Sequence, residues 1–227
     1  MDIANFHAWP DNYRDAVVQQ KQLAAGVILQ NDLPEQLRTI AGVDVSYEKH
    51  GDQFYAGVVI LSFPDLELIE EQTAVATVTF PYIPGLLSFR ELPVLLDAFR
   101  KVDTMPDLVL VDGQGIAHPR RFGLACHLGL WLDLPTIGCA KSRLVGDYDE
   151  PGPEKGRRSD LISGSERVGQ VVRTRDRVKP MFISPGHKVD VETASELALQ
   201  CCTRYRMPEP TRLAHQLTNR TRLTATG

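Results

Sequence analysis

The chain has 227 residues, of which 43% are hydrophobic, and it carries a formal net charge of −4 at pH 7. This apolar content can form a packed core, so the composition excludes an intrinsically disordered protein, and the length fits one domain over residues 1–227. The negative charge balance excludes a broadly basic nucleic-acid coat, although it leaves room for a local basic groove.

The N-terminal segment and the cysteines indicate the compartment. Residues 1–20 carry charges every few positions and no uninterrupted apolar stretch, which predicts neither a signal peptide nor a membrane span. The cysteines form no CxxC pair and no His/Cys metal spacing, which predicts reduced thiols. They are Cys126, Cys139, Cys201 and Cys202. We therefore expect a cytoplasmic protein.

The first third of the chain predicts a helix followed by antiparallel strands. Apolar residues recur at helical spacing over residues 13–31. Segments rich in Val, Ile and Thr, separated by Gly or Pro-Asp turns, predict strands at residues 40–48, 55–63 and 66–80. The short connections between them favour an antiparallel meander.

A stiff turn follows in "TFPYIPGLLSFRE", residues 79–91. Pro81 and Pro84 fix their own φ angles and restrict the residues before them, so the chain around Tyr82 is rigid. Gly85 then allows a backbone geometry or a close approach that a side chain would prevent. A packed core does not need such a turn.

A helix through residues 92–102 comes next, and the role of Glu91 at its start has two interpretations. Ser88 and Glu91 have the S-x-x-E spacing of a capping box. With that start, however, Pro93 falls inside the helix, where a backbone donor is needed. A later start, with Pro93 in the first turn, leaves Glu91 free for another role.

The rest of the chain alternates between strands and helices. Residues 107–115 form an apolar run that ends in an acid and glycines, as buried parallel strands do. We then expect a helix at 120–133, a strand at 135–144, a hairpin at 170–186, and helices at 191–205 and 209–220. Residues 146–164 are predicted as a surface loop, and a short tail follows about residue 218. This order predicts an α/β protein with a ribonuclease H-like mixed sheet flanked by helices.

Two acids stand inside otherwise apolar strands. Asp44 lies in "AGVDVSY" and Asp112 ends "LVLVD". A buried carboxylate is costly unless it is paired, hydrogen-bonded, protonated or bound to a metal, and a bond to a turn amide could explain one such acid. The first and fourth strands are neighbours in the predicted sheet, so both carboxylates would converge there. Like charges at that distance need a cation.

Basic residues follow these acids in the chain. We expect a basic patch beside the acids, although Lys141 alone could be a solvated strand end. The residues of this patch are His118, Arg120, Arg121, Lys141 and Arg143. Metal ions and cations together suit the cleavage of a phosphodiester. Cys126 and His127 are adjacent on a helix and point in different directions, so we interpret them as core residues.

The motifs of the chain resemble those of one family, endonuclease V, the deoxyinosine-directed repair nuclease. They are "AGVDVSY", "FPYIPGLLSFRE", "VDGQGIAHPRRFGLACHLGL", "PTIGCAKSRL", "FISPGH" and "EPTRLAH", in family order over residues 41–215. The resemblance implies a ribonuclease H-like fold and cleavage that depends on Mg²⁺, with Mn²⁺ able to replace it. It also implies hydrolysis of the second phosphodiester 3′ to the lesion, leaving a 3′-OH and a 5′-phosphate.

The resemblance also assigns roles to residues. The implied catalytic residues are the metal-binding acids Asp44, Glu91 and Asp112, with Lys141 and His215. The implied DNA contacts are the strand-separating wedge Pro81, Tyr82, Ile83 and Pro84, and the basic residues His118, Arg120, Arg121 and Arg143. The implied wall of the base pocket is Gly85, Leu87, Gly113, Gly123 and Leu124. The implied partner is DNA containing deoxyinosine. We expect the protein to be a monomer and to have no membrane partner.

Two other functions remain open at this point. The same chemistry could act on inosine-containing RNA, or the chain could be a nucleic-acid-binding module without catalysis. The presence of every matched acid and of the matched lysine favours an enzyme. A junction resolvase or a transposase-like nuclease would share the fold but would have no use for the wedge.

Overall fold

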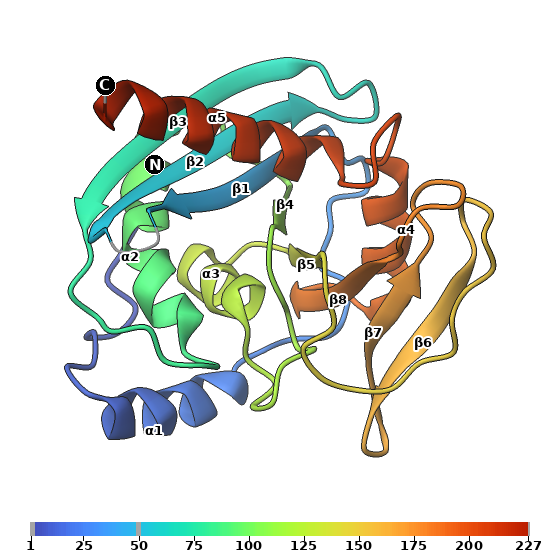
Figure 1. The fold of residues 1–227 in the computed structure, drawn as a ribbon, viewed down its shortest axis with the longest axis horizontal. Helices are drawn as coiled ribbons and strands as arrows, with labels where there is room; N and C mark the ends of the chain where they lie inside the picture. The colour runs from blue at the N-terminus through green and yellow to red at the C-terminus, as the bar shows by residue number, and fades with distance from the viewer. Residues whose placement is uncertain (1–2, 49–50, 227) are drawn as a thin grey trace.

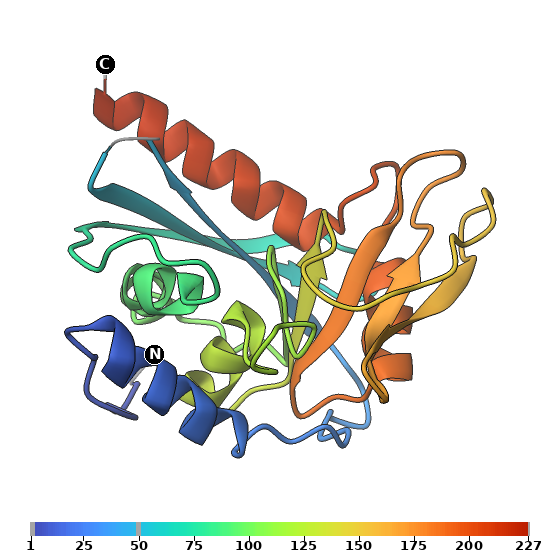
Figure 2. The same cartoon turned by 60° about the horizontal axis from the view of Figure 1, so that its bottom comes forward.

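The computed structural model describes residues 3–48 and 51–226. A single mixed sheet of eight strands, in the order β3-β2-β1-β4-β5-β8-β7-β6, runs through the molecule (Figure 1). Helices α2 and α3 cover one face, with α1 beside them, and α4 and α5 cover the other (Figure 2). Each face of the sheet has its own apolar cluster beneath these helices.

The bounds of the elements follow the predicted order closely. The strands are β1 (Thr39–Tyr47), β2 (Gln53–Ser62), β3 (Leu68–Thr77), β4 (Leu108–Val111), β5 (Thr136–Ala140), β6 (Arg158–Ser163), β7 (Glu166–Val172) and β8 (Met181–His187). The helices are α1 (Tyr13–Ala24), α2 (Leu87–Phe99), α3 (Leu124–Leu132), α4 (Val191–Gln200) and α5 (Glu209–Thr226). Of the elements expected, each has a counterpart here.

The strand pairing agrees with the expected sheet. β1, β2 and β3 form an antiparallel meander, and β7 and β8 form the antiparallel hairpin. β1 and β4 are parallel neighbours, with Val43 opposite Val111. Asp44 directly follows Val43 in the sequence, and Asp112 directly follows Val111. The pairing therefore brings both acids to the same place at the end of the two strands.

Some boundaries were predicted wrongly. The segment 146–164, expected to be a loop, ends in the strand β6, which pairs with β7. Its sequence gave no strand signal because it lies at the sheet edge, where Leu161 is its one buried residue. Helix α1 ends at Ala24, well before residue 31. Residues beyond 218 continue α5, and Arg220 in this part of the helix pairs with Glu71 of β3 at 2.9 Å.

Both interpretations of the start of α2 are also wrong. The helix begins at Leu87, and its N-cap, Leu86, makes no side-chain cap hydrogen bond. Ser88 therefore does not cap the helix, and its hydroxyl instead lies 3.1 Å from Nδ1 of His127. Pro93 lies inside the helix, and Glu91 is on its buried side.

The state of the cysteines agrees with the prediction of reduced thiols. All four cysteines are free and buried. Burial raises the pKa of the Cys126 thiol to about 12, so Cys126 is a core residue and not a nucleophile. Among the residues that the structure describes, no helix is both long enough and apolar enough to cross a membrane.

Gly42 in β1 lets α5 lie against the sheet. A Cβ atom at this position would stand 2.0 Å from the carbonyl carbon of Pro210, in the first turn of α5. We expect Gly42→Ala to lower the free energy of unfolding by roughly 1 to 3 kcal/mol, the usual cost of overpacking, as measured by chemical denaturation. Gly26→Ala is the control, since its nearest contact would be an ordinary 3.4 Å. Equal stability of both variants would contradict the close approach.

Candidate active site

Asp44, Asp112 and His215 form a compact group of potential metal ligands. One ligand atom from each lies within 4.8 Å of the others. Oδ2 of Asp44 accepts a hydrogen bond of 2.8 Å from the Thr218 hydroxyl and lies 3.1 Å from Nδ1 of His215. Both partners come from α5, so this helix orients the β1 carboxylate. Burial, followed by the charge of Asp112, raises the pKa of Asp44.

Glu91 approaches the same place from α2. It is 7% exposed, and burial followed by the charges of Asp44 and Asp112 raises its pKa to about 8. A carboxyl group with this pKa is mostly protonated at neutral pH when the protein is alone. A nearby cation would favour its ionised form.

Lys141 completes the group from the end of β5. Its Nζ lies 2.5 Å from Oδ2 of Asp112, and its side chain is 41% exposed. This ion pair reaches only one of the three acids directly. Carboxylate oxygens are ligands that suit Mg²⁺ or Mn²⁺, so the acids of this group fit such an ion.

Tyr82, which precedes Glu91 in the sequence, is exposed and lines a cavity. Tyr82 is 64% exposed, in the turn between β3 and α2, and Gly85 has a φ of +79°, which favours glycine. The cavity has a volume of about 150 Å³. Its lining contains Tyr82, Ile83, His118 and all the residues predicted for the base pocket, namely Gly85, Leu87, Gly113, Gly123 and Leu124.

Backbone forms much of this cavity wall. A Cβ atom on Gly123 would stand 2.2 Å from the carbonyl oxygen of Gln114, so a side chain cannot be added there without moving the wall. The sequence did not identify Gln20, Ser88, Gln114, Phe122 and Leu144 as lining residues. Gln20 comes from α1, and nothing in its local sequence distinguishes it from other surface glutamines.

The basic residues near the acids do not form one exposed patch. Arg120 donates 2.6 Å to the Gly85 carbonyl and also bonds to Gln20. Arg121 donates 2.6 Å to Glu166. Both guanidinium groups are therefore engaged within the protein. Their contact with nucleic acid remains a prediction.

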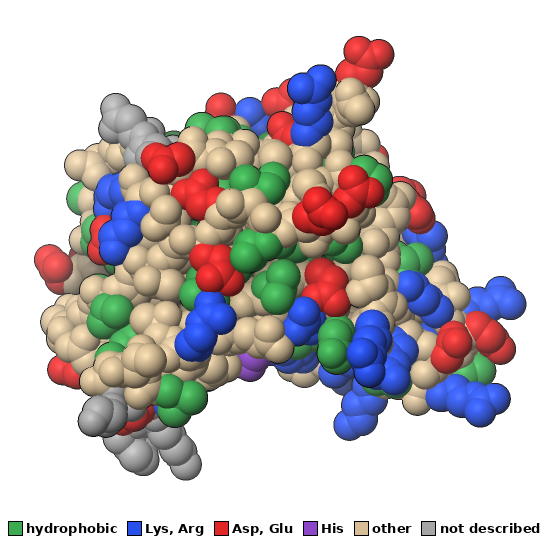
Figure 3. Space-filling model, turned by 90° about the horizontal axis from the view of Figure 1, so that it is seen from above, with side chains coloured by type: hydrophobic (Ala, Val, Ile, Leu, Met, Phe, Trp, Pro, Cys, Tyr) green, Lys and Arg blue, Asp and Glu red, His purple; other side chains and the backbone are tan. Residues whose placement is uncertain are grey.

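His118 and Arg143 also have partners within the protein. Nδ1 of His118 accepts a 3.1 Å hydrogen bond from the Arg120 backbone, and burial lowers the pKa of His118 to about 4. The imidazole is thus neutral at pH 7. Arg143 is more exposed and pairs with Asp147 at 3.1 Å. On the face shown in Figure 3, acidic and basic side chains are interspersed, and basic ones gather at the end where β6 and β7 lie.

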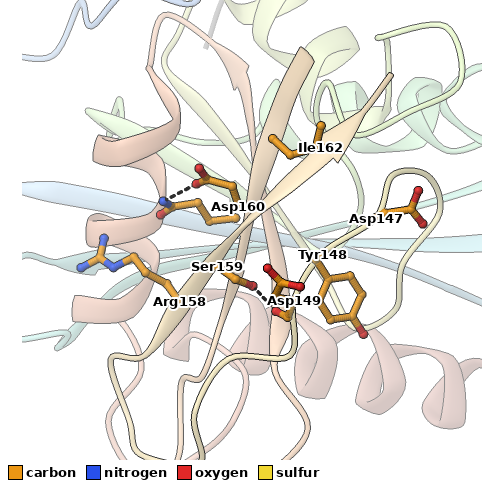
Figure 4. Close-up of a pocket in the computed structure, with 8 residues that line it drawn as sticks. Asp147, Tyr148, Asp149, Arg158, Ser159, Asp160 and Ile162 are labelled. Carbon is orange, nitrogen blue, oxygen red and sulfur yellow. Dashed lines mark hydrogen bonds between the residues drawn. The ribbon is translucent and has the colours of Figure 1, made fainter. Parts of the chain in front are cut away.

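A wider hollow of about 650 Å³ lies beside β6, and its lining includes Asp147, the partner of Arg143. Figure 4 shows its walls, which carry the carboxylates of Asp147, Asp149 and Asp160. It shares no residue with the cavity under Tyr82 or with the acid group. Its acidic lining would repel a phosphodiester, so we place the candidate active site at Asp44 and Asp112 instead.

Comparisons with known proteins agree with the motifs. The sequence profile of the Endonuclease V family matches residues 21–216. Endonuclease V of Nostoc punctiforme is 50% identical over 211 residues, which cover 93% of this chain and 96% of that protein. The crystal structure of Endonuclease V from Streptomyces avermitilis is 42% identical, has a TM-score of 0.90, and matches 97% of each chain. The predicted ribonuclease H-like α/β fold is thereby confirmed.

A solved complex is also similar. Endonuclease V from Ciona intestinalis, in complex with a 24mer DNA containing an inosine followed by a ribo-adenosine, is 29% identical with a TM-score of 0.82. The match covers 94% of this chain and 98% of that chain.

The buried imidazole of His118 makes a pH-dependent contribution to stability. Its pKa is 6.5 in a model peptide and about 4 here, chiefly because of burial, so the unfolded chain binds the extra proton first as pH falls. This contribution is complete above about pH 6.5 and is lost on acidification toward pH 4. We expect His118→Gln to lose less stability than the wild type between pH 7 and pH 5, as measured by urea unfolding. Parallel pH profiles would contradict the assignment.

Proposed function

The chain belongs to the endonuclease V family, and we propose that it hydrolyses DNA at deoxyinosine, the product of adenine deamination. In this proposal the cut falls at the second phosphodiester 3′ to the lesion and leaves a 3′-OH and a 5′-phosphate. The observation that carries it is the group of Asp44, Asp112 and His215, with Glu91 close by. The short segment 82–91 joins Glu91 to the exposed Tyr82. We also propose that the protein acts as a monomer in the cytoplasm.

The acids hold the metal in this proposal. Asp44, Glu91 and Asp112 supply carboxylate oxygens for Mg²⁺, which Mn²⁺ can replace. When bound, the ion stabilises negative charge on the attacking and leaving oxygens. His215 orients Asp44 through their 3.1 Å contact. Lys141, half exposed beside Asp112, moves to the phosphoryl oxygens and offsets the charge that develops on them.

Tyr82 and the cavity under it supply recognition. Removing a base from the stack costs a few kcal/mol, and less when the base is mispaired, as hypoxanthine is. The exposed ring of Tyr82 fills the gap, and its fixed turn loses little entropy on binding. The base enters the cavity, where the backbone at Gly113 and Gly123 reaches its edge. The Ciona intestinalis complex, whose DNA contains an inosine, supports this assignment.

Inosine-containing RNA is the second candidate substrate. The same Ciona intestinalis complex has a ribo-adenosine after the inosine, so that relative binds a ribonucleotide beside the lesion. A module that binds without cleaving is disfavoured here, because Asp44, Glu91, Asp112 and Lys141 are all present and lie near one another.

One cleavage experiment tests the function. End-labelled DNA and RNA of matched sequence, each with one inosine, are incubated with Mg²⁺, and the products are sized to a single nucleotide. We expect DNA cleavage one nucleotide beyond the inosine on its 3′ side. A cut directly at the inosine, or no cut in either polymer, would contradict the proposal, and faster RNA cleavage would favour the second candidate.

Asp112→Asn is the control for the role of the acids. We expect it to abolish cleavage in Mg²⁺ while it keeps or tightens binding to inosine DNA, because it removes a metal ligand and leaves the cavity intact. In the wild type, added Mg²⁺ should raise the melting temperature, and this increase should be smaller in the variant. Retained cleavage would exclude the metal-binding role of Asp112.

Tyr82→Ala separates a wedge from a purely structural turn. We expect the substitution to weaken recognition of inosine in duplex DNA by roughly 1 to 3 kcal/mol, the usual value of a base–aromatic stack. The loss on single-stranded inosine DNA should be smaller, since no partner strand has to be held away. The melting temperature should hardly change, because the ring is 64% exposed. Equal losses on both substrates, with a lower melting temperature, would show that Tyr82 only stabilises the turn.

A further inference from the structure

Arg90, in α2, lies against two aromatic rings at the ends of β1 and β2. Its guanidinium carbon is 4.9 Å from the centre of the Phe54 ring and 5.7 Å from the centre of the Tyr47 ring. The two rings are stacked, with centroids 4.4 Å apart and planes 12° apart. Cation–π attraction and stacking hold the guanidinium in one orientation.

The polar atoms of this guanidinium are unused in the part of the chain that the structure describes. There, Arg90 makes no hydrogen bond or ion pair, and its Nε is buried without a partner. Most buried polar side-chain atoms in native proteins have such a partner. An oriented guanidinium with free donors is suited to bind the oxygens of a phosphate, which it can contact with two nitrogens at once.

The Arg90 stack is close enough to Glu91 and to Tyr82 for both to act electrostatically on Tyr47. Burial raises the pKa of the Tyr47 hydroxyl, and the charges of Glu91 and Tyr82 act in the same direction. Tyr47 is therefore within electrostatic range of both the acid group and the tip of the turn. Tyr47 is 36% exposed, so its hydroxyl can be reached from solvent.

The start of α2 adds to the attraction for an anion. Its N-cap residue, Leu86, makes no side-chain cap hydrogen bond, and no acidic residue lies in the first turn. The partial positive charge at this helix end is therefore not balanced by its own turn. Arg90 stands just after that turn. In the described part of the chain, Arg90 makes no ion pair with Glu91, the next residue in the sequence.

We propose that Arg90 and Tyr47 together bind one backbone phosphate of the nucleic acid, between the wedge and the metal-binding acids. This inference rests on the proposed function, because it assumes a nucleic acid that spans Tyr82 and Asp44. Arg90 donates hydrogen bonds to the non-bridging oxygens, and the Tyr47 hydroxyl donates another. The contact fixes the register of the strand and leaves the reading of the base to the cavity.

The first test counts phosphate contacts through salt dependence. Binding of an inosine duplex is measured without divalent metal over a range of salt concentrations. We expect Arg90→Met to weaken binding about tenfold at low salt and to reduce the slope of log K against log salt by about 1, as loss of one phosphate contact does. The control is Arg157→Met, which removes the same charge from an exposed pair with Glu154. It should change neither quantity. An unchanged slope for Arg90→Met would overturn the proposal.

The second test identifies the phosphate and requires only the wild-type fold. Duplexes with a single neutral methylphosphonate linkage are compared at each position around the inosine. We expect the wild type to lose affinity at one linkage near the lesion, and Arg90→Met to lose none there. Arg90→Lys should restore the salt slope but not the full affinity, because lysine keeps the charge without the planar donor geometry. Additive losses at every linkage would show that Arg90 touches no phosphate.

Two further measurements separate the possible failures. Preference for inosine over adenine is recorded for the wild type on the same samples. Its absence would contradict the proposed function, whereas the salt slope and the linkage series would still report on Arg90. Inorganic phosphate at matched ionic strength should displace the duplex no better than chloride does. Selective displacement that is lost in Arg90→Met would show a site for free phosphate instead of a strand contact.

Discussion

Repulsion between carboxylates at the ends of β1 and β4 is the constraint on which the site depends. The parallel pairing of Val43 with Val111 forces Asp44 and Asp112 to the same place, and α2 brings Glu91 to it. Burial, followed by the charges of Asp44 and Asp112, raises the pKa of Glu91 to about 8, even with Lys141 bonded to Asp112. The fold thus holds together carboxylates that would be more stable apart. A bound cation would reduce this repulsion. The apolar clusters on both faces of the sheet supply the stability that offsets it in the protein alone.

The turn before α2 links this charge centre mechanically to recognition. Tyr82 and Glu91 belong to one short segment, so the position of the wedge and the position of the acid cannot change independently. The helix starts at Leu87, directly after the turn, and Pro93 lies inside it two residues beyond Glu91. A nucleic acid that meets the ring of Tyr82 is therefore already in a defined relation to the acids.

The sequence predicted those parts of the site that violate a local pattern. Asp44 and Asp112 were visible because each interrupts an apolar run that a sheet would bury. β6 was missed because a polar edge strand has no such pattern, and the start of α2 was misplaced because Pro93 usually marks a first turn. Gln20 could not have been found, since its role exists only when α1 packs beside the cavity. The sequence shows which residues are charged, but not which of them are already paired or hydrogen-bonded within the protein.

The backbone carbonyl of Gly85 illustrates this last difference. It accepts hydrogen bonds from Gln20, at 3.0 Å, and from Arg120, at 2.6 Å. Residues that look like a phosphate-binding patch in the sequence therefore brace the turn from behind. In the proposed function, a turn held this way would lose little conformational entropy on entering a duplex, so this bracing would favour recognition. In the proposed function, the cations that contact phosphates would therefore be few and local, which is compatible with a net charge of −4.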